Sequence, residues 1–170
     1  GIYLFQISLW YLALLLTFYF LLTAYASWDI QLHYHLKTRN KIDTEEKVIA
    51  ITFDDGPSDF TLEVLDLLDK FNSKAGFFCI GKNIVNKPEI LQKVAKAGHI
   101  IGNHSFSHSN SFDFYPASKM IAECKKTDKL IEKYTGKKPR YFRPPYGITN
   151  PAIKKTVETQ GYEAIGWNIR

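Results

Sequence analysis

The stretch that decides the fold runs from Lys47 to Pro57 and reads Lys-Val-Ile-Ala-Ile-Thr-Phe-Asp-Asp-Gly-Pro. Its first seven residues, 47–53, are rich in β-branched and aromatic side chains, which is the pattern of a buried strand. Two adjacent carboxylates and a Gly-Pro pair follow, and these residue types favour a turn. The sequence therefore predicts a strand that ends in a turn carrying Asp54 and Asp55.

The rest of the chain alternates between helical and extended patterns. Apolar residues recur at helical spacing in the first predicted helix, and Pro or Gly marks the ends of the later ones. Helices are predicted at residues 61–71, 88–97, 116–134 and 150–160, and further strands at 75–80, 99–102, 141–142 and 162–167. Strands that alternate with helices of about 10–20 residues imply a parallel sheet with right-handed crossovers, so the fold class is α/β.

Polar side chains follow three of the predicted strands. Asp54 and Asp55 follow the first, His104 and His108 the third, and Arg143 the fourth. Sites in α/β folds form at the C-terminal ends of strands, so we expect these side chains to lie close together. Two His residues four apart, with a carboxylate, make a ligand set for Zn²⁺ or another first-row divalent ion. The alternatives are a solvated helix face for the His pair and a simple turn for the Asp pair.

The two adjacent carboxylates can divide two tasks. Consecutive residues point in different directions, so one can bind a metal ion while the other stays free as a base. A free carboxylate is a useful base only if a partner holds it ionised and oriented, and Arg143 is the expected partner. A metal ion that polarises a carbonyl and acidifies water completes the requirements for hydrolysis.

At these residues the chain resembles the polysaccharide deacetylase family, also called the NodB-homology domain or carbohydrate esterase family four. The family motifs Thr-Phe-Asp-Asp-Gly, His-(Ser/Thr)-x-x-His and Arg-x-Pro-Tyr match residues 52–56, 104–108 and 143–146, in order. The resemblance covers residues 46–170. It implies a distorted (β/α) barrel and hydrolysis of N-acetyl groups on N-acetylglucosamine units of peptidoglycan, chitin or a related glycan; some family members remove O-acetyl groups.

The resemblance also implies a role for each matching residue. Asp54 corresponds to the general base, and Arg143 to the residue that orients it. Asp55, His104 and His108 correspond to the metal ligands. The expected cofactor is one divalent metal ion, with Zn²⁺ first and Co²⁺ or another first-row ion as alternatives.

On the substrate side, the resemblance implies that the main-chain N–H of Tyr146 helps to hold the oxyanion, with Pro145 and Trp167 as further candidates. Trp167 stands where the family's fourth motif has a Trp, but residues 168–170 contain no acidic partner for it. No residue matches the His of the fifth motif, which protonates the leaving amine. We therefore expect a barrel that is incomplete at its C-terminus, with a natural pseudoenzyme as the alternative.

The first 28 residues contain no Lys, Arg, Asp or Glu. About 20 apolar residues in a helix span the hydrocarbon core of a bilayer, so this segment is expected to be one transmembrane helix. A cleavable signal peptide is the alternative, because Ala24-Tyr25-Ala26 fits a small-x-small cleavage pattern. The expected organisation is an anchor at 1–28, a linker at 29–45 and a catalytic domain at 46–170 outside the cytoplasm. The basic residues after the anchor leave the orientation open.

Composition and net charge limit the classes of protein and of binding partner that are expected. A hydrophobic content of 45% excludes a disordered chain. The net charge of +5 comes without a nucleic-acid-binding motif, so nucleic acid is not an expected partner. The expected partners are an N-acetylated glycan and membrane lipid. Two alternative functions stay open: a deacetylase or deformylase of lipid-linked sugars, and a glycan-binding module that retains metal without turnover.

Overall fold

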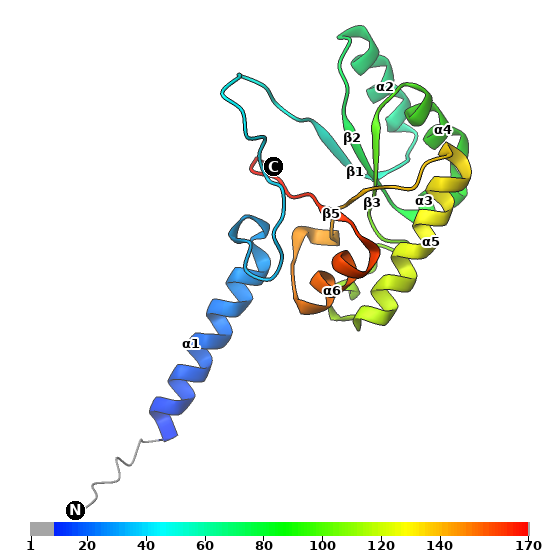
Figure 1. The fold of residues 1–170 in the computed structure, drawn as a ribbon. Coiled ribbons are helices and arrows are strands. Elements are labelled where there is room, and N and C mark those ends of the chain that lie inside the picture. Colours follow the sequence, from blue (N-terminus) through cyan, green and yellow to red (C-terminus); the bar gives the residue numbers. More distant parts are fainter. Residues whose placement is uncertain (1–8, 170) are drawn as a thin grey trace, which may run out of the picture.

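The computed structural model describes residues 9–169 of the chain. An N-terminal helix precedes an α/β unit with one parallel sheet (Figure 1). The helices are α1 (Leu9–Trp28), α2 (Phe60–Lys70), α3 (Gly81–Asn86), α4 (Pro88–Lys96), α5 (Ala117–Thr135) and α6 (Pro151–Gln160). The strands are β1 (Thr52–Gly56), β2 (Gly76–Cys79), β3 (Ile100–Asn103), β4 (Tyr141–Phe142) and β5 (Glu163–Ala164). Three single-turn 3₁₀ helices are η1 (Ile30–Leu32), η2 (Phe112–Phe114) and η3 (Pro145–Gly147).

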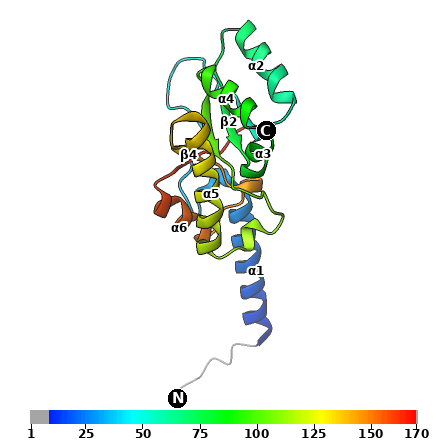
Figure 2. The same cartoon turned by 90° about the vertical axis from the view of Figure 1, so that its right-hand side faces the viewer.

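The sheet has the order β1-β2-β3-β4-β5, and every neighbouring pair is parallel. Helices α2 to α5 lie on one face of it, as Figures 1 and 2 show together. The other face looks onto a cavity of about 720 Å³ that residues 39–51 and 165–169 help to line. This arrangement confirms the predicted α/β class with a parallel sheet. It also brings the C-terminal ends of the strands to one edge.

Two apolar clusters hold the sheet and the helices together. One lies between the first strands and α2 to α5, and its members include Leu68, Phe77, Ile84, Leu91 and Ile131. The other lies around α5, α6 and β4, and its members include Phe112, Met120, Phe142, Ile153 and Tyr162. Full burial of one such Leu, Ile or Phe side chain stabilises the fold by roughly 1.5–3 kcal/mol. The strands are therefore held in fixed positions by packed apolar side chains.

The first strand lies later in the sequence than its pattern predicts. Residues 47–53 were expected to form a buried strand, but β1 begins at Thr52, and residues 47–51 are exposed, with Ile49 at 84%. The reason is that residues 47–51 have no strand to pair with. Thr52 lies opposite Gly76, the first residue of β2, and within the described residues no other strand pairs with residues 47–51. An apolar run without a partner strand does not become a strand.

Two further differences concern short elements. The strand predicted at 75–80 ends at Cys79, and Gly81 begins the six-residue helix α3, which the sequence did not predict. The last strand, predicted at 162–167, is limited to Glu163–Ala164, and the chain beyond it is irregular apart from the bridge between Ile165 and Arg39. Periodicity says little about elements of two to six residues, because they contain less than two turns of a helix.

Helix α1 has 20 residues and is long and apolar enough to cross a membrane. It points away from the sheet (Figure 1), and Ala26 is its one buried residue among those described. The chain that follows packs on the α/β unit, with Ile30 and Leu36 buried. The N–H of Thr149 donates to the carbonyl of Ser27 at 2.9 Å, so the end of α1 contacts the loop that precedes α6.

Candidate functional site

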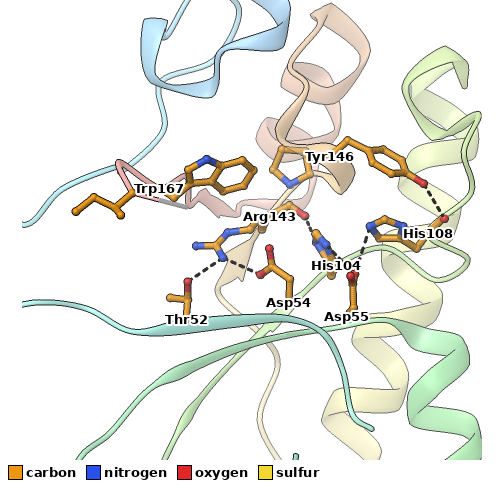
Figure 3. A pocket seen from close by; sticks show the side chains of 10 residues that line it. Thr52, Asp54, Asp55, His104, His108, Arg143, Tyr146 and Trp167 are labelled. Carbon is orange, nitrogen blue, oxygen red and sulfur yellow. Dashed lines mark hydrogen bonds and ion pairs between the residues drawn. The ribbon is translucent and has the colours of Figure 1, made fainter. Parts of the chain in front are cut away.

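A pocket of about 520 Å³ opens where the C-terminal ends of β1, β3 and β4 meet (Figure 3). Four segments far apart in the sequence contribute to its wall, each at or after the end of a strand, as expected for a parallel sheet. Its lining residues are Thr52, Asp54, Asp55, His104, His108, Arg143, Pro144, Tyr146, Trp167 and Ile169. Seven of the eight residues singled out from the sequence are among them. The exception is Pro145, which is buried in η3 beside the lining residue Pro144.

The end of β1 is irregular, and this irregularity directs the two carboxylates. The register between β1 and β2 shifts between Phe53 and Gly56, as at a β-bulge. Asp55 has a φ of +63°, a left-handed conformation that is uncommon for residues other than glycine. The amide of Asn83 on α3 holds this conformation, because its Nδ2 donates to the main-chain carbonyl of Asp55 at 2.7 Å.

Asp55, His104 and His108 form the one compact group of potential metal ligands in residues 9–169, which is called the metal group. The Oδ1 atom of Asp55 lies 3.5 Å from Nε2 of His104 and 3.4 Å from Nε2 of His108. The two imidazole rings have centroids 4.9 Å apart. Figure 3 shows the three side chains converging from β1 and from the loop after β3.

These distances fit a metal ion better than they fit hydrogen bonds. An N–H···O hydrogen bond normally spans about 2.7–3.2 Å, which is shorter than both His–Asp separations. Ligand atoms about 2.0–2.2 Å from a tetrahedral Zn²⁺ lie roughly 3.3–3.6 Å from one another. Two imidazoles and one carboxylate are also a ligand set that leaves positions open for substrate and water. The residues present therefore fit one divalent ion.

The ring of His104 is fixed on its other side. Its Nδ1 lies 2.7 Å from the carbonyl of Arg143, which places the proton on Nδ1 and leaves Nε2 free as a ligand atom. The His104 side chain is almost fully buried, and this burial lowers its pKa below the ordinary value. A lowered pKa favours the neutral ring, which is the form that binds metal.

Asp54 lies beside the metal group and is held by Arg143. The Nη1 atom of Arg143 donates to Oδ1 of Asp54 at 2.7 Å and to Oγ1 of Thr52 at 2.9 Å. The rest of the guanidinium donates to the carbonyls of Ile165 and Gly166. Burial lowers the pKa of Arg143, and the Asp54 carboxylate acts in the opposite direction. The carboxylate therefore has one oxygen engaged and a fixed orientation.

Tyr146 closes another side of the pocket from η3. It has a φ of +60°, its hydroxyl donates to Oδ1 of Asn110 at 2.8 Å, and its ring packs edge-on against His108 at 4.7 Å. Gly147 follows it, and a Cβ at that position would lie 2.3 Å from the Trp167 ring. This close approach places the indole against η3, at the rim of the pocket.

Sequence reasoning missed two of the residues that hold this arrangement, Asn83 and Asn110. Asn83 lies on α3, a helix too short to be predicted, and Asn110 follows His108 in a loop without a periodic pattern. Both act through single side-chain hydrogen bonds, and only the folded chain brings their partners near. Among the described residues that line the pocket, the His residues are the two in the metal group.

Comparison with known proteins agrees with this geometry. A family model described as "Polysaccharide deacetylase" matches residues 41–165. A peptidoglycan-N-acetylglucosamine deacetylase of Bacillus cereus is 38% identical over 150 residues, which cover 86% of this chain and 62% of that protein. This chain therefore spans about three fifths of the length of that relative.

Solved structures give the same result. The peptidoglycan deacetylase PdaC from Bacillus subtilis superimposes with a TM-score of 0.68 at 34% identity, over 75% of this chain and 62% of that one. A family 4 carbohydrate esterase from Streptomyces lividans, solved in complex with acetate, gives a TM-score of 0.67 at 30% identity, over 71% of this chain and 62% of that one. By sequence and by fold, this chain belongs to the polysaccharide deacetylase family.

Proposed function

We propose that the protein is a metal-dependent deacetylase that hydrolyses N-acetyl groups on a glycan containing N-acetylglucosamine, with peptidoglycan as the first candidate. The observation that carries this proposal is the pairing of two groups in one pocket. Asp55, His104 and His108 offer a metal-binding set, and Asp54 stands next to it as a carboxylate held by Arg143. The names of the relatives, which are peptidoglycan deacetylases, support the choice of substrate.

The metal proposed for this site is Zn²⁺, held by Asp55, His104 and His108. When bound, such an ion supplies polarisation of the acetamide carbonyl and lowers the pKa of water. Asp54 takes the proton of the attacking water as the new carbon–oxygen bond forms, and Arg143 keeps that carboxylate in the orientation required. The same proton would pass from Asp54 to the amine nitrogen as the carbon–nitrogen bond breaks, so that acetate and a free amine leave. The main-chain N–H of Tyr146 donates to the oxygen on which negative charge develops.

The glycan is proposed to lie against the aromatic side chains at the rim. Tyr146 and Trp167 both line the pocket, and Tyr146 is partly exposed. Exposed aromatic rings give flat apolar surfaces on which sugar rings pack. Pro145 precedes Tyr146 in η3 and is buried.

For the location, we propose that residues 1–28 anchor the protein in the cell membrane, that residues 29–45 form a linker and that residues 46–170 form the catalytic domain outside the cytoplasm. Helix α1 is the supporting observation, since it has the length and composition of a membrane span. A glycan of the cell wall lies outside the membrane, so this topology would bring the site to its substrate.

The test measures acetate release from N-acetylglucosamine oligomers and from peptidoglycan, with and without Zn²⁺. Asp54→Asn is expected to abolish release while metal binding is retained, and Asp55→Ala is expected to lose both. Asp66→Asn serves as the matched control, because Asp66 is an exposed carboxylate on α2. If Asp54→Asn releases acetate at the rate of the control, the proposal is wrong. Glycan binding without acetate release from any variant would instead identify a non-catalytic binding module.

A further inference from the structure

A buried polar cluster lies next to the chain segment that carries His104. It consists of Asn103 at the end of β3, Asp128 on α5 and Tyr162 just before β5, all of them buried. Nδ2 of Asn103 donates to Oδ1 of Asp128 at 2.7 Å, and the hydroxyl of Tyr162 donates to Oδ2 at 2.7 Å. Nδ2 of Asn103 also lies 2.9 Å from the carbonyl of Cys124 on α5. Three elements are thus joined by one carboxylate.

Burial of these polar groups in an apolar core costs free energy of folding. Burial raises the pKa of Asp128, and the hydrogen bonds from Asn103 and Tyr162 act in the opposite direction. Buried polar groups are tolerated when they are fully hydrogen-bonded, yet apolar side chains of similar volume are often as stable or more stable. Stability alone therefore gives little reason for a carboxylate at this position.

The cluster contacts the backbone that carries the metal ligands. Oδ1 of Asn103 accepts a hydrogen bond from the N–H of Ser105 at 2.8 Å, so it spans His104. Ser105 has a φ of +65°, and its hydroxyl accepts the N–H of His108 at 3.1 Å. The amide of Asn103 is thus one of the groups that hold the turn between the two imidazoles, together with the hydroxyl of Thr127, which donates to the carbonyl of Ser105 at 2.9 Å.

The carboxylate contributes the shortest of the hydrogen bonds that orient that amide. An ionised carboxylate only accepts hydrogen bonds, whereas an amide has a donating and an accepting end. Asp128 therefore keeps the NH₂ end of Asn103 facing α5, and the oxygen end faces the N–H of Ser105. The carbonyl of Cys124 accepts from the same NH₂ group, so a change at position 128 weakens the orientation of the amide without removing its last support.

We propose that Asn103, Asp128 and Tyr162 are positioning residues for the metal group, a role that rests on the proposed function. They act through the turn at Ser105, which sets the direction of His104, and they contact neither substrate nor metal. Partners that orient metal ligands typically change metal affinity by about 10–100-fold when they are altered. This cluster is one step further away, so the lower end of that range applies.

The test titrates metal-free protein, purified in detergent, with Zn²⁺ by calorimetry and with Co²⁺ by visible absorption. Asp128→Asn is expected to weaken metal binding by about 10-fold and to change the Co²⁺ spectrum, which reports ligand geometry. Tyr162→Phe removes a single hydroxyl from the cluster and is expected to act in the same direction with a smaller loss. Thermal unfolding of the metal-free variants records their stability separately.

Thr156→Val is the matched control, since it removes a buried hydroxyl that bonds only within α6. The inference is overturned if both cluster variants bind metal within about twofold of the unaltered protein and keep its Co²⁺ spectrum. Asp55→Ala separates this result from a failure of the proposed function. If that variant binds metal as tightly as the unaltered protein, or if the unaltered protein binds none, the metal site itself is wrong and the positioning role falls with it.

Discussion

Replacement of Arg143 by Met tests the assignment of Asp54 as an oriented base. The Arg143 side chain is 3% exposed, and its charged partner Asp54 is 32% exposed. Removal of one partner from a buried ion pair costs about 3–5 kcal/mol. Solvent reaches Asp54, so the lower end applies, and we expect a loss of about 3 kcal/mol, which corresponds to about 6–12 °C in melting temperature. Acetate release should fall by at least about 10²-fold, since an unoriented base contributes little.

Arg140→Met supplies the comparison within the same segment. Arg140 is 73% exposed and pairs with Glu163 at the surface, where an ion pair contributes about 0–1 kcal/mol. Its loss should leave acetate release unchanged. The double variant of Arg143→Met with Asp54→Asn should be less destabilised than the sum of the two single changes, because an uncharged amide does not require the guanidinium. A coupling of about 1–3 kcal/mol is expected.

The assay is thermal unfolding of metal-free protein followed by circular dichroism, together with acetate release from an N-acetylglucosamine oligomer. The reasoning is refuted if Arg143→Met melts within about 2 °C of Arg140→Met. It is also refuted if the effects of Arg143→Met and Asp54→Asn on stability are additive, since additivity would mean that the two groups do not interact.

Three further changes have defined outcomes. Gly147→Ala places a Cβ 2.3 Å from the Trp167 ring at a φ of +73°, so melting temperature and glycan affinity should fall, and unchanged glycan affinity would contradict the assigned rim. Gly81→Ala places a Cβ 2.4 Å from the Phe106 ring in the loop between His104 and His108, the proposed metal ligands, so calorimetry should show weaker Zn²⁺ binding. Burial raises the pKa of Asp113 to about 6, and its Oδ1 has no hydrogen-bond partner among the described residues. The stability that comes from protonated Asp113 is fully present below about pH 4 and is lost as pH rises through about 6, where the folded chain gives up this proton. An Asn side chain stays neutral at every pH. Asp113→Asn should therefore stabilise the protein by about 1 kcal/mol at pH 8, a value reduced for solvent screening of a half-buried group, and should give no gain at pH 4.

The residues of the pocket could be predicted because their chemistry is concentrated in short local patterns. The pair Asp54 and Asp55, the His104-x-x-x-His108 spacing and Arg143 each follow a strand, and a parallel sheet brings such positions together. What lies outside local patterns could not be predicted in this way. The run at 47–51 has the composition of a strand, yet strand formation depends on a partner, which is information from elsewhere in the chain.

The supporting residues show the same limit more sharply. Asn83 fixes Asp55 from 28 positions away in the sequence, and Asp128 fixes Asn103 from 25 positions away. Asn and Asp are common in exposed loops and on helix faces, so their residue type alone does not distinguish a structural hydrogen bond from a solvated side chain. Only the fold shows which of them are buried and what they contact.

The bulge at the end of β1 explains how two adjacent carboxylates come to share one pocket. In a regular strand, Asp54 and Asp55 would point to opposite faces of the sheet, so only one of them could face the site. The shifted register and the positive φ of Asp55 turn the second carboxylate back toward His104 and His108. The backbone strain at Asp55 is therefore what allows one strand end to place both the proposed metal ligand and the proposed base in the pocket, and the Asn83 side chain donates to the carbonyl of the strained residue.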